Sequence, residues 1–579
     1  MENSNHKKPG LSSLLEPYRN LIIGLIALSF AASGLNLAIP KIIARSIDAY
    51  TAGNFNFNVV ATEFIVAAFF VFIFTYVQSL IQTLTSEKVA RDLRTRLANK
   101  ISRQSYAYVQ NTNSAKLLTN LTSDIDSIKL FVAQAIVSIA SSLFIIVGAS
   151  ALLLFINWRL ALAVLVMIPI IGFTFFFVFA KVKTLFKIRS ENIDRLNQVI
   201  NESILGAALI RVLNSQQPEY EKFMTLNIET RGIGMQILKL FASMIPIITF
   251  AANFSFLIIV LYGGHLVIIE NLSLGDFTAF SAYVALLIFP IIIIGFMSNV
   301  IAQASASYER VNEILEAEEP KVVGKITAPL TGQISVHNLN LEFNNSGKPI
   351  LKDISFSIKA GTKTAILGPT AAGKTQLLYI LTGLIKPDSG EVRYDNQLIT
   401  EFQETNFHKH LGFVFQDSVV FNTTIRENIA FNTKVTDADL QKSIDTAELN
   451  DFIQSLPDGL KTMVSERGTS LSGGQKQRIM LARALALNPQ VLFLDDFTAR
   501  VDYSTEQKIL TNIAKNYPNT TIISVTQRIA SVKEYDQIII LMEGEMIGIG
   551  THAELLENNP EYMQLYQSQK STSHYELRT

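Results

Sequence analysis

The stretch that decides the fold of this chain is Ile366-Leu367-Gly368-Pro369-Thr370-Ala371-Ala372-Gly373-Lys374-Thr375. Its apolar start predicts the end of a β-strand, and a helix is expected to begin at Lys374. Glycines at this spacing before Lys-Thr are typical of a phosphate-binding loop, whose backbone N–H groups and following helix N-terminus surround phosphate groups. The loop, residues 368–375, is therefore predicted to bind ATP, with Lys374 on the β- and γ-phosphates and Thr375 on Mg²⁺.

Further residues complete the predicted ATP and metal site. The apolar run 491–494 is expected to be a strand, and Asp495 directly after it is the predicted Mg²⁺ ligand. Gln416 is a candidate for a second contact to the metal and to the attacking water. Phe343 lies 25 residues before Gly368 and is expected to stack on the adenine ring, unless it is an ordinary strand aromatic.

The composition points to a membrane protein. Only 17% of the residues are charged, the formal net charge is zero and there is no Cys. The charge balance implies no attraction to nucleic acid, and disulfides and Cys-based zinc sites are excluded. Six uncharged runs in the first half are each long enough to cross a bilayer. Membrane spans are expected at roughly 20–46, 60–86, 130–157, 159–181, 238–268 and 275–302.

Basic residues predict the orientation of these spans. The connections 87–129 and 181–239 contain eight and nine Lys or Arg, whereas the connections on the other side contain three in total. Because Lys and Arg concentrate on the cytoplasmic side, both long connections and both chain ends are expected in the cytoplasm, beside a cytoplasmic membrane. Apolar residues at helical spacing continue through 81–105 and 181–205, so we expect long helical extensions of the spans.

A domain boundary is expected where loop-forming residues follow the last span. Residues 1–316 are predicted to form an all-α transmembrane domain, and residues 317–332, with Pro320 and Gly332, a linker. Beyond the linker, β-rich runs alternate with helical ones, so residues 333–579 are predicted to form an α/β P-loop nucleotide-binding domain.

These motifs, in this order and spacing, resemble the exporter type of ABC (ATP-binding cassette) transporter over nearly the whole chain. The resemblance also rests on a signature stretch and on an acidic residue that follows Asp495 by seven positions. These residues are Leu471, Ser472, Gly473, Gly474, Gln475 and Asp502. It implies six spans fused to one nucleotide domain, ATP and Mg²⁺ as cofactors, and two nucleotide domains that close head-to-tail. The signature residues would then contact the ATP held by the partner's phosphate loop.

Two residues depart from the family pattern at positions that serve hydrolysis. Asp496 stands where the family has a Glu that polarises the attacking water, and its carboxylate falls about 1.5 Å short. Gln527 stands where the family has a His beside the γ-phosphate, and an amide cannot carry the positive charge of a protonated imidazole. With Gln416, these residues are the candidate catalytic positions of a site that binds ATP and hydrolyses it poorly. The segment 499–502, Ala-Arg-Val-Asp, also differs from the usual Ser-Ala-Leu-Asp.

The pairing of Asp with Gln resembles the degenerate-site subunit of heterodimeric bacterial ABC exporters. It implies ATP-driven export across the cytoplasmic membrane, together with a second half-transporter that keeps the catalytic Glu. The Phe-rich fourth span suits a small hydrophobic or amphipathic substrate, although such Phe residues more often face lipid. The alternatives are a homodimer with two slow sites, an ATP-gated regulatory or channel subunit, and an importer of the same fold.

Overall fold

The structure is a computed structural model that describes residues 10–320, 324–342, 349–432, 434–465, 468, 470–498 and 500–576. The chain divides into two compact units. The first unit contains the residues up to Arg103 together with Thr112–Glu318. The second contains Gln104–Asn111 and the residues from Glu319 onward. A short segment from the first half of the chain thus belongs to the second unit.

Within the described residues of the first unit, six continuous helical segments are long and apolar enough to cross a membrane. They are Ser13–Thr51, Phe57–Ser102, Ser114–Ile156, Trp158–Leu205, Gln216–Ile268 and Leu274–Glu316. The third segment ends one residue before the expected span does, because Asn157 leaves the helical conformation and accepts a hydrogen bond from Leu160 N–H as the cap of the next helix. The chain is therefore a multi-pass membrane protein.

The elements of this unit include three five-residue π-helical segments where the hydrogen-bond ladder widens. In chain order the elements are α1 (Leu11–Leu15), η1 (Glu16–Tyr18), α2 (Arg19–Thr51), α3 (Phe57–Ser102), α5 (Ser114–Thr119), η2 (Asn120–Asp124), α6 (Ile125–Leu130), η3 (Phe131–Ala135), α7 (Ile136–Ile156), α8 (Trp158–Leu165), α9 (Met167–Leu205), α10 (Ala207–Val212), α11 (Gln216–Ile258), η4 (Ile259–Gly263), α12 (Gly264–Ile268) and α13 (Leu274–Glu316).

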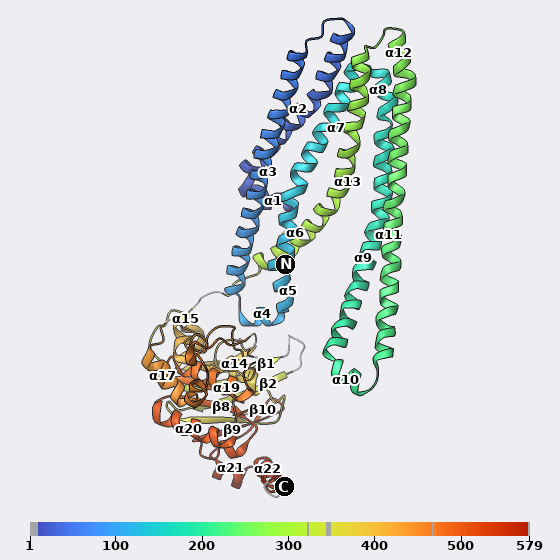
Figure 1. The fold of residues 1–579 in the computed structure, drawn as a ribbon. Helices are drawn as coiled ribbons and strands as arrows, with labels where there is room; N and C mark the ends of the chain where they lie inside the picture. Colours follow the sequence, from blue (N-terminus) through green and yellow to red (C-terminus); the bar gives the residue numbers. More distant parts are fainter. Residues whose placement is uncertain are drawn as a thin grey trace. The chain divides into compact units, whose positions relative to one another are not determined.

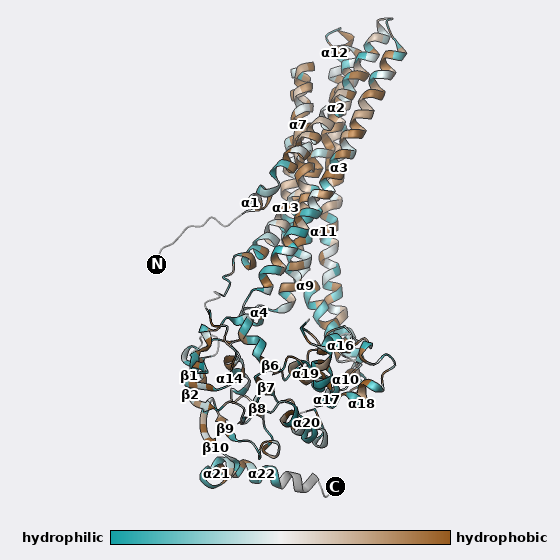
Figure 2. Cartoon of the chain, turned by 90° about the vertical axis from the view of Figure 1, so that its left-hand side faces the viewer, coloured by the Kyte–Doolittle hydropathy of each residue, from teal (hydrophilic) through white to brown (hydrophobic). Residues whose placement is uncertain are grey.

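The long helices of the first unit pack in two groups. Helix α9 packs along α11, while α2 packs against α3, α7 and α13 (Figure 1). The buried Tyr283 of α13 donates a hydrogen bond to the Leu37 carbonyl of α2 (2.9 Å). Hydrophobic residues dominate α2, α3 and α7, and hydrophilic residues become frequent toward the lower ends of α9 and α11 (Figure 2). Helix α9 continues to Leu205, as the apolar spacing in 181–205 predicts.

The second unit is an α/β domain. Its strands are β1 (Ile334–Glu342), β2 (Pro349–Ile358), β3 (Lys363–Leu367), β4 (Ser389–Tyr394), β5 (Gln397–Leu398), β6 (Leu411–Val414), β7 (Val491–Asp495), β8 (Thr521–Thr526), β9 (Gln537–Met542) and β10 (Glu545–Gly550). Its helices of four or more residues are α4 (Tyr106–Asn111), α14 (Lys374–Leu381), α15 (Glu404–Phe407), α16 (Ile425–Ile429), α17 (Asp437–Thr446), α18 (Asn450–Gln454), α19 (Gly473–Leu485), α20 (Tyr503–Asn516), α21 (His552–Asn558) and α22 (Pro560–Glu576).

Two sheets organise this domain. One is antiparallel in the order β2-β1-β4-β5, and the other has the order β10-β9-β3-β8-β7-β6. In the second sheet the strands from β9 to β6 are parallel, and β10 is an antiparallel edge strand. Because the carboxyl ends of parallel strands share one edge, the residues that follow β3, β6, β7 and β8 meet there.

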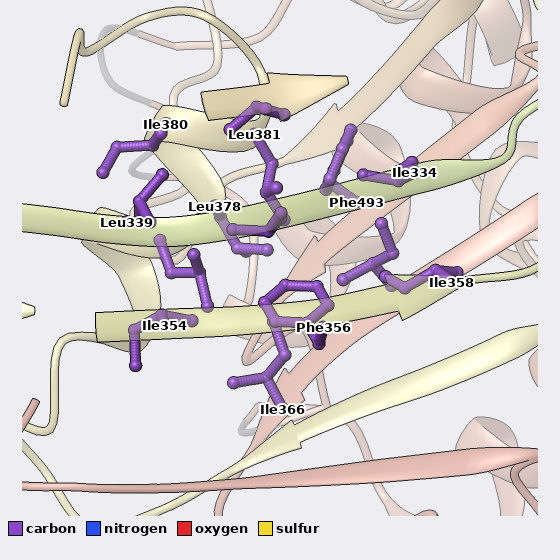
Figure 3. Packing of buried hydrophobic residues seen from close by; sticks show 14 of the residues in the cluster. Ile334, Leu339, Ile354, Phe356, Ile358, Ile366, Leu378, Ile380, Leu381 and Phe493 are labelled. Carbon is purple, nitrogen blue, oxygen red and sulfur yellow. The ribbon is translucent and has the colours of Figure 1, made fainter. Parts of the chain in front are cut away.

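The apolar core between the sheets holds that edge in place. Side chains of β1 and β2 pack with α14 and with Phe493 of β7 (Figure 3). Ile334, Leu339 and Ile354 are fully buried there. This packing fixes the start of α14 relative to β7, and hence the phosphate loop relative to the carboxylates. The predicted fold class, a six-helix transmembrane domain followed by an α/β P-loop domain, is confirmed.

Candidate nucleotide-binding site

The phosphate loop turns back on itself between the end of β3 and the start of α14. Ala371 and Gly373 have positive φ angles of 65° and 90°. A Cβ on Gly373 would lie 2.8 Å from the Leu351 side chain and 2.9 Å from the Ile350 carbonyl. A Cβ on Gly368 would lie 2.1 Å from the Leu541 carbonyl. Both glycines are therefore required by the close approach of neighbouring backbone.

Lys374 lies at the centre of the loop and is almost fully buried. Its Nζ donates hydrogen bonds to the carbonyl oxygens of Gly368 (2.8 Å) and Pro369 (2.7 Å). Burial lowers the pKa of Lys374, and the nearby charges of Asp496 and Asp495 oppose that shift. These two carboxylates favour the ammonium form that an anionic phosphate chain requires.

Asp495 ends β7 with only 1% of its surface exposed. Its Oδ1 accepts a hydrogen bond from the Thr375 hydroxyl (3.3 Å), and its buried Oδ2 has no hydrogen-bond partner among the described residues. Burial raises the pKa of this carboxyl, with a further contribution from Asp496. A buried carboxylate oxygen without a partner is costly unless a cation or another donor satisfies it.

Magnesium fits this set of atoms. Mg²⁺ prefers oxygen ligands and is usually held by one or two carboxylates together with substrate phosphates. Asp495, the Thr375 hydroxyl and the Gln416 amide offer such oxygens around one cavity. Among the described residues, no three His, Cys, Asp or Glu side chains converge into a metal-binding group. The ion would therefore rely on Asp495, neutral oxygens and the nucleotide.

The cavity has a volume of about 280 Å³. Ten of the sequence-predicted residues line it: Thr370, Ala371, Ala372, Gly373, Lys374, Thr375, Gln416, Asp495, Asp496 and Gln527. Gly368 and Pro369, at the start of the loop, are not among the lining residues, and their carbonyl oxygens accept the Lys374 hydrogen bonds instead. Phe343 lies outside the described residues. The edge of the parallel sheet thus brings the predicted ATP and metal residues into one place.

Four lining residues were not anticipated: Ile350, Gln376, Val525 and Thr526. Gln376 follows Thr375 in the first turn of α14, and Val525 and Thr526 precede Gln527. Their position next to predicted residues in the sequence could therefore have identified them as lining residues. Ile350 carries no such signal, because it reaches the loop only through the packing of β2 against Gly373.

The two departures from the family pattern both face this cavity. Asp496 adopts a left-handed backbone conformation (φ 47°), and its N–H donates to the Val525 carbonyl (3.0 Å). The Gln527 side chain donates through Nε2 to the Thr370 hydroxyl (3.2 Å). The short carboxylate and the neutral amide therefore both line the cavity that the phosphate loop borders.

The signature residues do not line the cavity; they form the start of α19. Ser472 Oγ accepts from the Gln475 N–H (3.2 Å), and Gln475 Oε1 accepts from the Ser472 N–H (2.8 Å), which is a capping box. Leu471 immediately precedes this box. The result is a capped helix N-terminus, and the start of a helix is a common binding place for anions.

Arg500 packs over the signature glycines. A Cβ on Gly473 would lie 3.0 Å from Arg500 Cδ, and one on Gly474 would lie 2.8 Å from the Arg500 carbonyl. Asp502 follows and caps α20 by accepting from the Thr505 N–H (2.9 Å). Hydrogen bonds from Ser504 and Thr505 lower the pKa of Asp502, so it is ionised at neutral pH.

Comparisons with known proteins agree with this geometry. Residues 21–291 match the family model described as the ABC transporter transmembrane region, and residues 351–499 match the ABC transporter model. An uncharacterized ABC transporter ATP-binding protein, YfiB of Bacillus subtilis (strain 168), is 31% identical over 84% of this chain and 84% of its own. The probable multidrug resistance ABC transporter ATP-binding/permease protein YheI of the same organism is 29% identical over 94% of each chain.

A solved structure shares the fold. A bacterial Atm1-family ABC exporter with ATP bound aligns with a TM-score of 0.78 and 22% identity, over 95% of this chain and 98% of the other. One ABC transmembrane region and one ABC nucleotide domain therefore lie in this chain. The protein belongs to the ABC transporter family, and its nucleotide domain is an ATPase coupled to transport.

Proposed function

We propose that this protein is one subunit of a heterodimeric exporter, whose own ATP site binds nucleotide but hydrolyses it slowly. The observation that carries the proposal is the set of residues that line the cavity. Every predicted phosphate and Mg²⁺ residue that lines it is of the expected type, and the two residues expected to drive hydrolysis are Asp496 and Gln527. Binding is thus supported, and activation of water is not.

Two side chains, Asp496 and Gln527, would limit hydrolysis at this site. The Asp496 carboxylate is one methylene shorter than that of a Glu, and a misplacement near 1 Å costs about a hundredfold in rate. The Gln527 amide donates to Thr370 Oγ1 at 3.2 Å, so it can reach a γ-phosphate without neutralising its charge. Bound Mg²⁺ would neutralise charge on the phosphates, while Lys374 and the loop N–H groups hold them in place.

The partner would supply the faster site. The signature residues of α19 lie outside this chain's own cavity, which supports a role at the phosphate loop of a second chain. Ser472, Gly473 and Gly474 would place a hydroxyl and the helix N-terminus at the partner's γ-phosphate, with Asp502 nearby. The partner would carry the Glu and the His that this chain lacks.

ATP binding at both sites would close the two nucleotide domains and switch the spans from inward to outward access. The orientation with both termini in the cytoplasm is supported by the Lys and Arg bias of the connections. YheI is named as a probable multidrug resistance transporter, and this likeness supports a small hydrophobic or amphipathic substrate. Hydrolysis at the partner's site would reset the cycle.

Nucleotide retention tests the proposal. The chain and its partner are purified as a complex, loaded with 8-azido-ATP and chased with unlabelled ATP for one turnover before photolabelling. We expect label to remain on this chain's phosphate loop after the partner's has gone, and Lys374→Ala to remove it. Equal loss of label from both subunits would refute the slow-site assignment.

A further inference from the structure

The helix α22 (Pro560–Glu576) is hydrogen-bonded to the segment that carries Gln527. The side-chain amide of Gln569 makes two main-chain hydrogen bonds there. Its Nε2 donates to the Gln527 carbonyl (2.6 Å), and its Oε1 accepts from the Ile529 N–H (3.0 Å). A single planar amide thereby bridges both ends of the segment 527–529. The side-chain amide of Gln569 can do this because it carries a donor and an acceptor on one carbon.

Helix α22 is itself fixed in place by the same apolar cluster that buries Ile529. Tyr562 is fully buried, and its hydroxyl lies 2.6 Å from His552 Nδ1. Ile529 is 1% exposed in the cluster that contains Tyr562. The Tyr566 ring packs on His552, with ring centroids 5.3 Å apart. Gln569 therefore approaches the 527–529 segment from a rigid support.

A continuous set of contacts runs from α22 to the phosphate loop. Gln569 holds the main chain of Gln527, and the side chain of Gln527 in turn donates to Thr370 Oγ1 within the nucleotide cavity. A hydrogen bond prefers a donor–hydrogen–acceptor angle above about 150° and weakens steeply below about 120°. The direction of Gln527 consequently matters more than it would for a charged side chain.

We propose that Gln569 is a positioning residue, which fixes the main chain at residues 527–529 so that the Gln527 amide points at the γ-phosphate of bound ATP. The inference rests on the role of Gln527 proposed above. It assigns a part in nucleotide recognition to a helix that no motif marks. Removing the two hydrogen bonds of the Gln569 amide should therefore weaken the binding of ATP and leave the binding of ADP unchanged, because ADP has no γ-phosphate.

The test uses the full chain in lipid nanodiscs with EDTA, so that no hydrolysis occurs, and measures displacement of TNP-ADP by ATP and by ADP. Gln569→Ala is expected to weaken ATP binding roughly three- to tenfold, the value of about one hydrogen bond, with ADP affinity unchanged. Gln569→Glu should behave like Gln569→Ala, since a carboxylate cannot donate to the Gln527 carbonyl. Gln567→Ala, an exposed glutamine on the same helix, is the matched control and should change neither affinity.

Two further variants distinguish the positioning role of Gln569 from the proposed role of Gln527 itself. Gln527→Ala should lower the preference for ATP over ADP to a similar extent, and adding Gln569→Ala to it should have no further effect. If Gln527→Ala lowers the preference and Gln569→Ala does not, the positioning role is wrong while Gln527 keeps its role. Equal weakening of ATP and ADP by Gln569→Ala would show a merely structural contact and overturn the inference. An unchanged preference in Gln527→Ala overturns both.

Discussion

Asp496 occupies a left-handed backbone conformation, with φ at 47°. Asp and Asn adopt this region far more readily than most other residues do. Asp496→Asn therefore preserves the local backbone and removes only the charge. This makes the substitution a clean probe of whether the Asp496 carboxylate contributes to hydrolysis.

The first prediction compares that substitution with one in the signature. In the complex with its partner, Asp496→Asn should change steady-state ATP hydrolysis less than about twofold, because a carboxylate out of position contributes little. Ser472→Ala should lower hydrolysis by at least roughly tenfold, since it removes a preorganised hydroxyl from the partner's site. Phosphate release measures both. Ser472→Thr, which keeps the hydroxyl and the helix cap, is the control. A larger loss in Asp496→Asn would mean that this chain's own site drives the cycle.

The second prediction concerns Asp495 and Mg²⁺. Burial raises the pKa of this carboxyl in the folded protein, so its ionised form lowers the stability of the metal-free protein as the pH rises through that pKa. Asp495→Asn should accordingly be at least as stable as the wild type without nucleotide at pH 7.5. With Mg²⁺ and ATP at about 100 times Kd, the wild type should gain about 5 °C in apparent melting temperature, and Asp495→Asn far less.

Two conditions check that reasoning. ATP with EDTA should stabilise the wild type and Asp495→Asn equally, because the carboxylate acts through the metal. Asp458→Asn, an exposed substitution, should keep the full gain from Mg²⁺ and ATP. Wild-type stabilisation by Mg²⁺ and ATP should also shrink as the pH falls and Asp495 becomes protonated. A full gain in Asp495→Asn would exclude Asp495 as the metal ligand.

At the scale of elements, the contact between α2 and α13 depends on one glycine. A Cβ on Gly275 would lie 2.1 Å from the Ala44 carbonyl and 2.6 Å from the Asp48 carboxylate. The Gly275 N–H also donates to Asp48 Oδ1 (2.8 Å), and Lys41 pairs with Asp276 beside it (2.7 Å). The two helices can approach this closely only because residue 275 has no side chain.

The third prediction follows from that approach. Gly275→Ala should lower stability by about 1–3 kcal/mol, the usual cost of overpacking a tight contact, because backbone must move to admit the methyl group. Gly264→Ala is the matched control, since a Cβ there would meet no atom within 4 Å, and it should be neutral or slightly stabilising. Fluorescence-detected size-exclusion thermostability of a GFP fusion measures both. Equal melting temperatures would show that the helices are not in contact at Gly275.

At the scale of the whole molecule, the absence of Cys in the chain makes introduced cysteines unambiguous reporters of assembly. In the proposed heterodimer, head-to-tail closure would place the Ser472 side chain of one nucleotide domain near the phosphate loop of the other. The two positions would be contributed by different chains, so a disulfide between them reports the pairing directly.

The fourth prediction uses this property. Ser472→Cys in this chain should cross-link, with ATP and copper phenanthroline, to a cysteine at the position matching Thr370 in the partner. The same chain carrying both Ser472→Cys and Thr370→Cys, expressed alone, should stay monomeric on a non-reducing gel. A strong homodimer band from the double variant would favour the homodimer with two slow sites. The double variant therefore separates the two assemblies without any transport assay.

The sequence by itself determined the features that depend on neighbouring residues. The phosphate loop 368–375 is recognisable because its glycines and Lys374 lie within eight consecutive residues. The membrane spans are recognisable because each is a continuous apolar run. The departures at Asp496 and Gln527 are visible for the same reason. The order of the motifs was sufficient for the family.

Only the tertiary structure decided the features that join distant residues. Gln527 and Thr370 are 157 positions apart, and their contact exists because β3 and β8 are adjacent in the parallel sheet. Ile350 reaches the loop through strand packing, and Gln569 reaches residues 527–529 because Tyr562 anchors α22 on the cluster that buries Ile529. No periodicity or motif encodes these contacts, since side chains from separate elements meet only after the sheet order and the apolar core have been established.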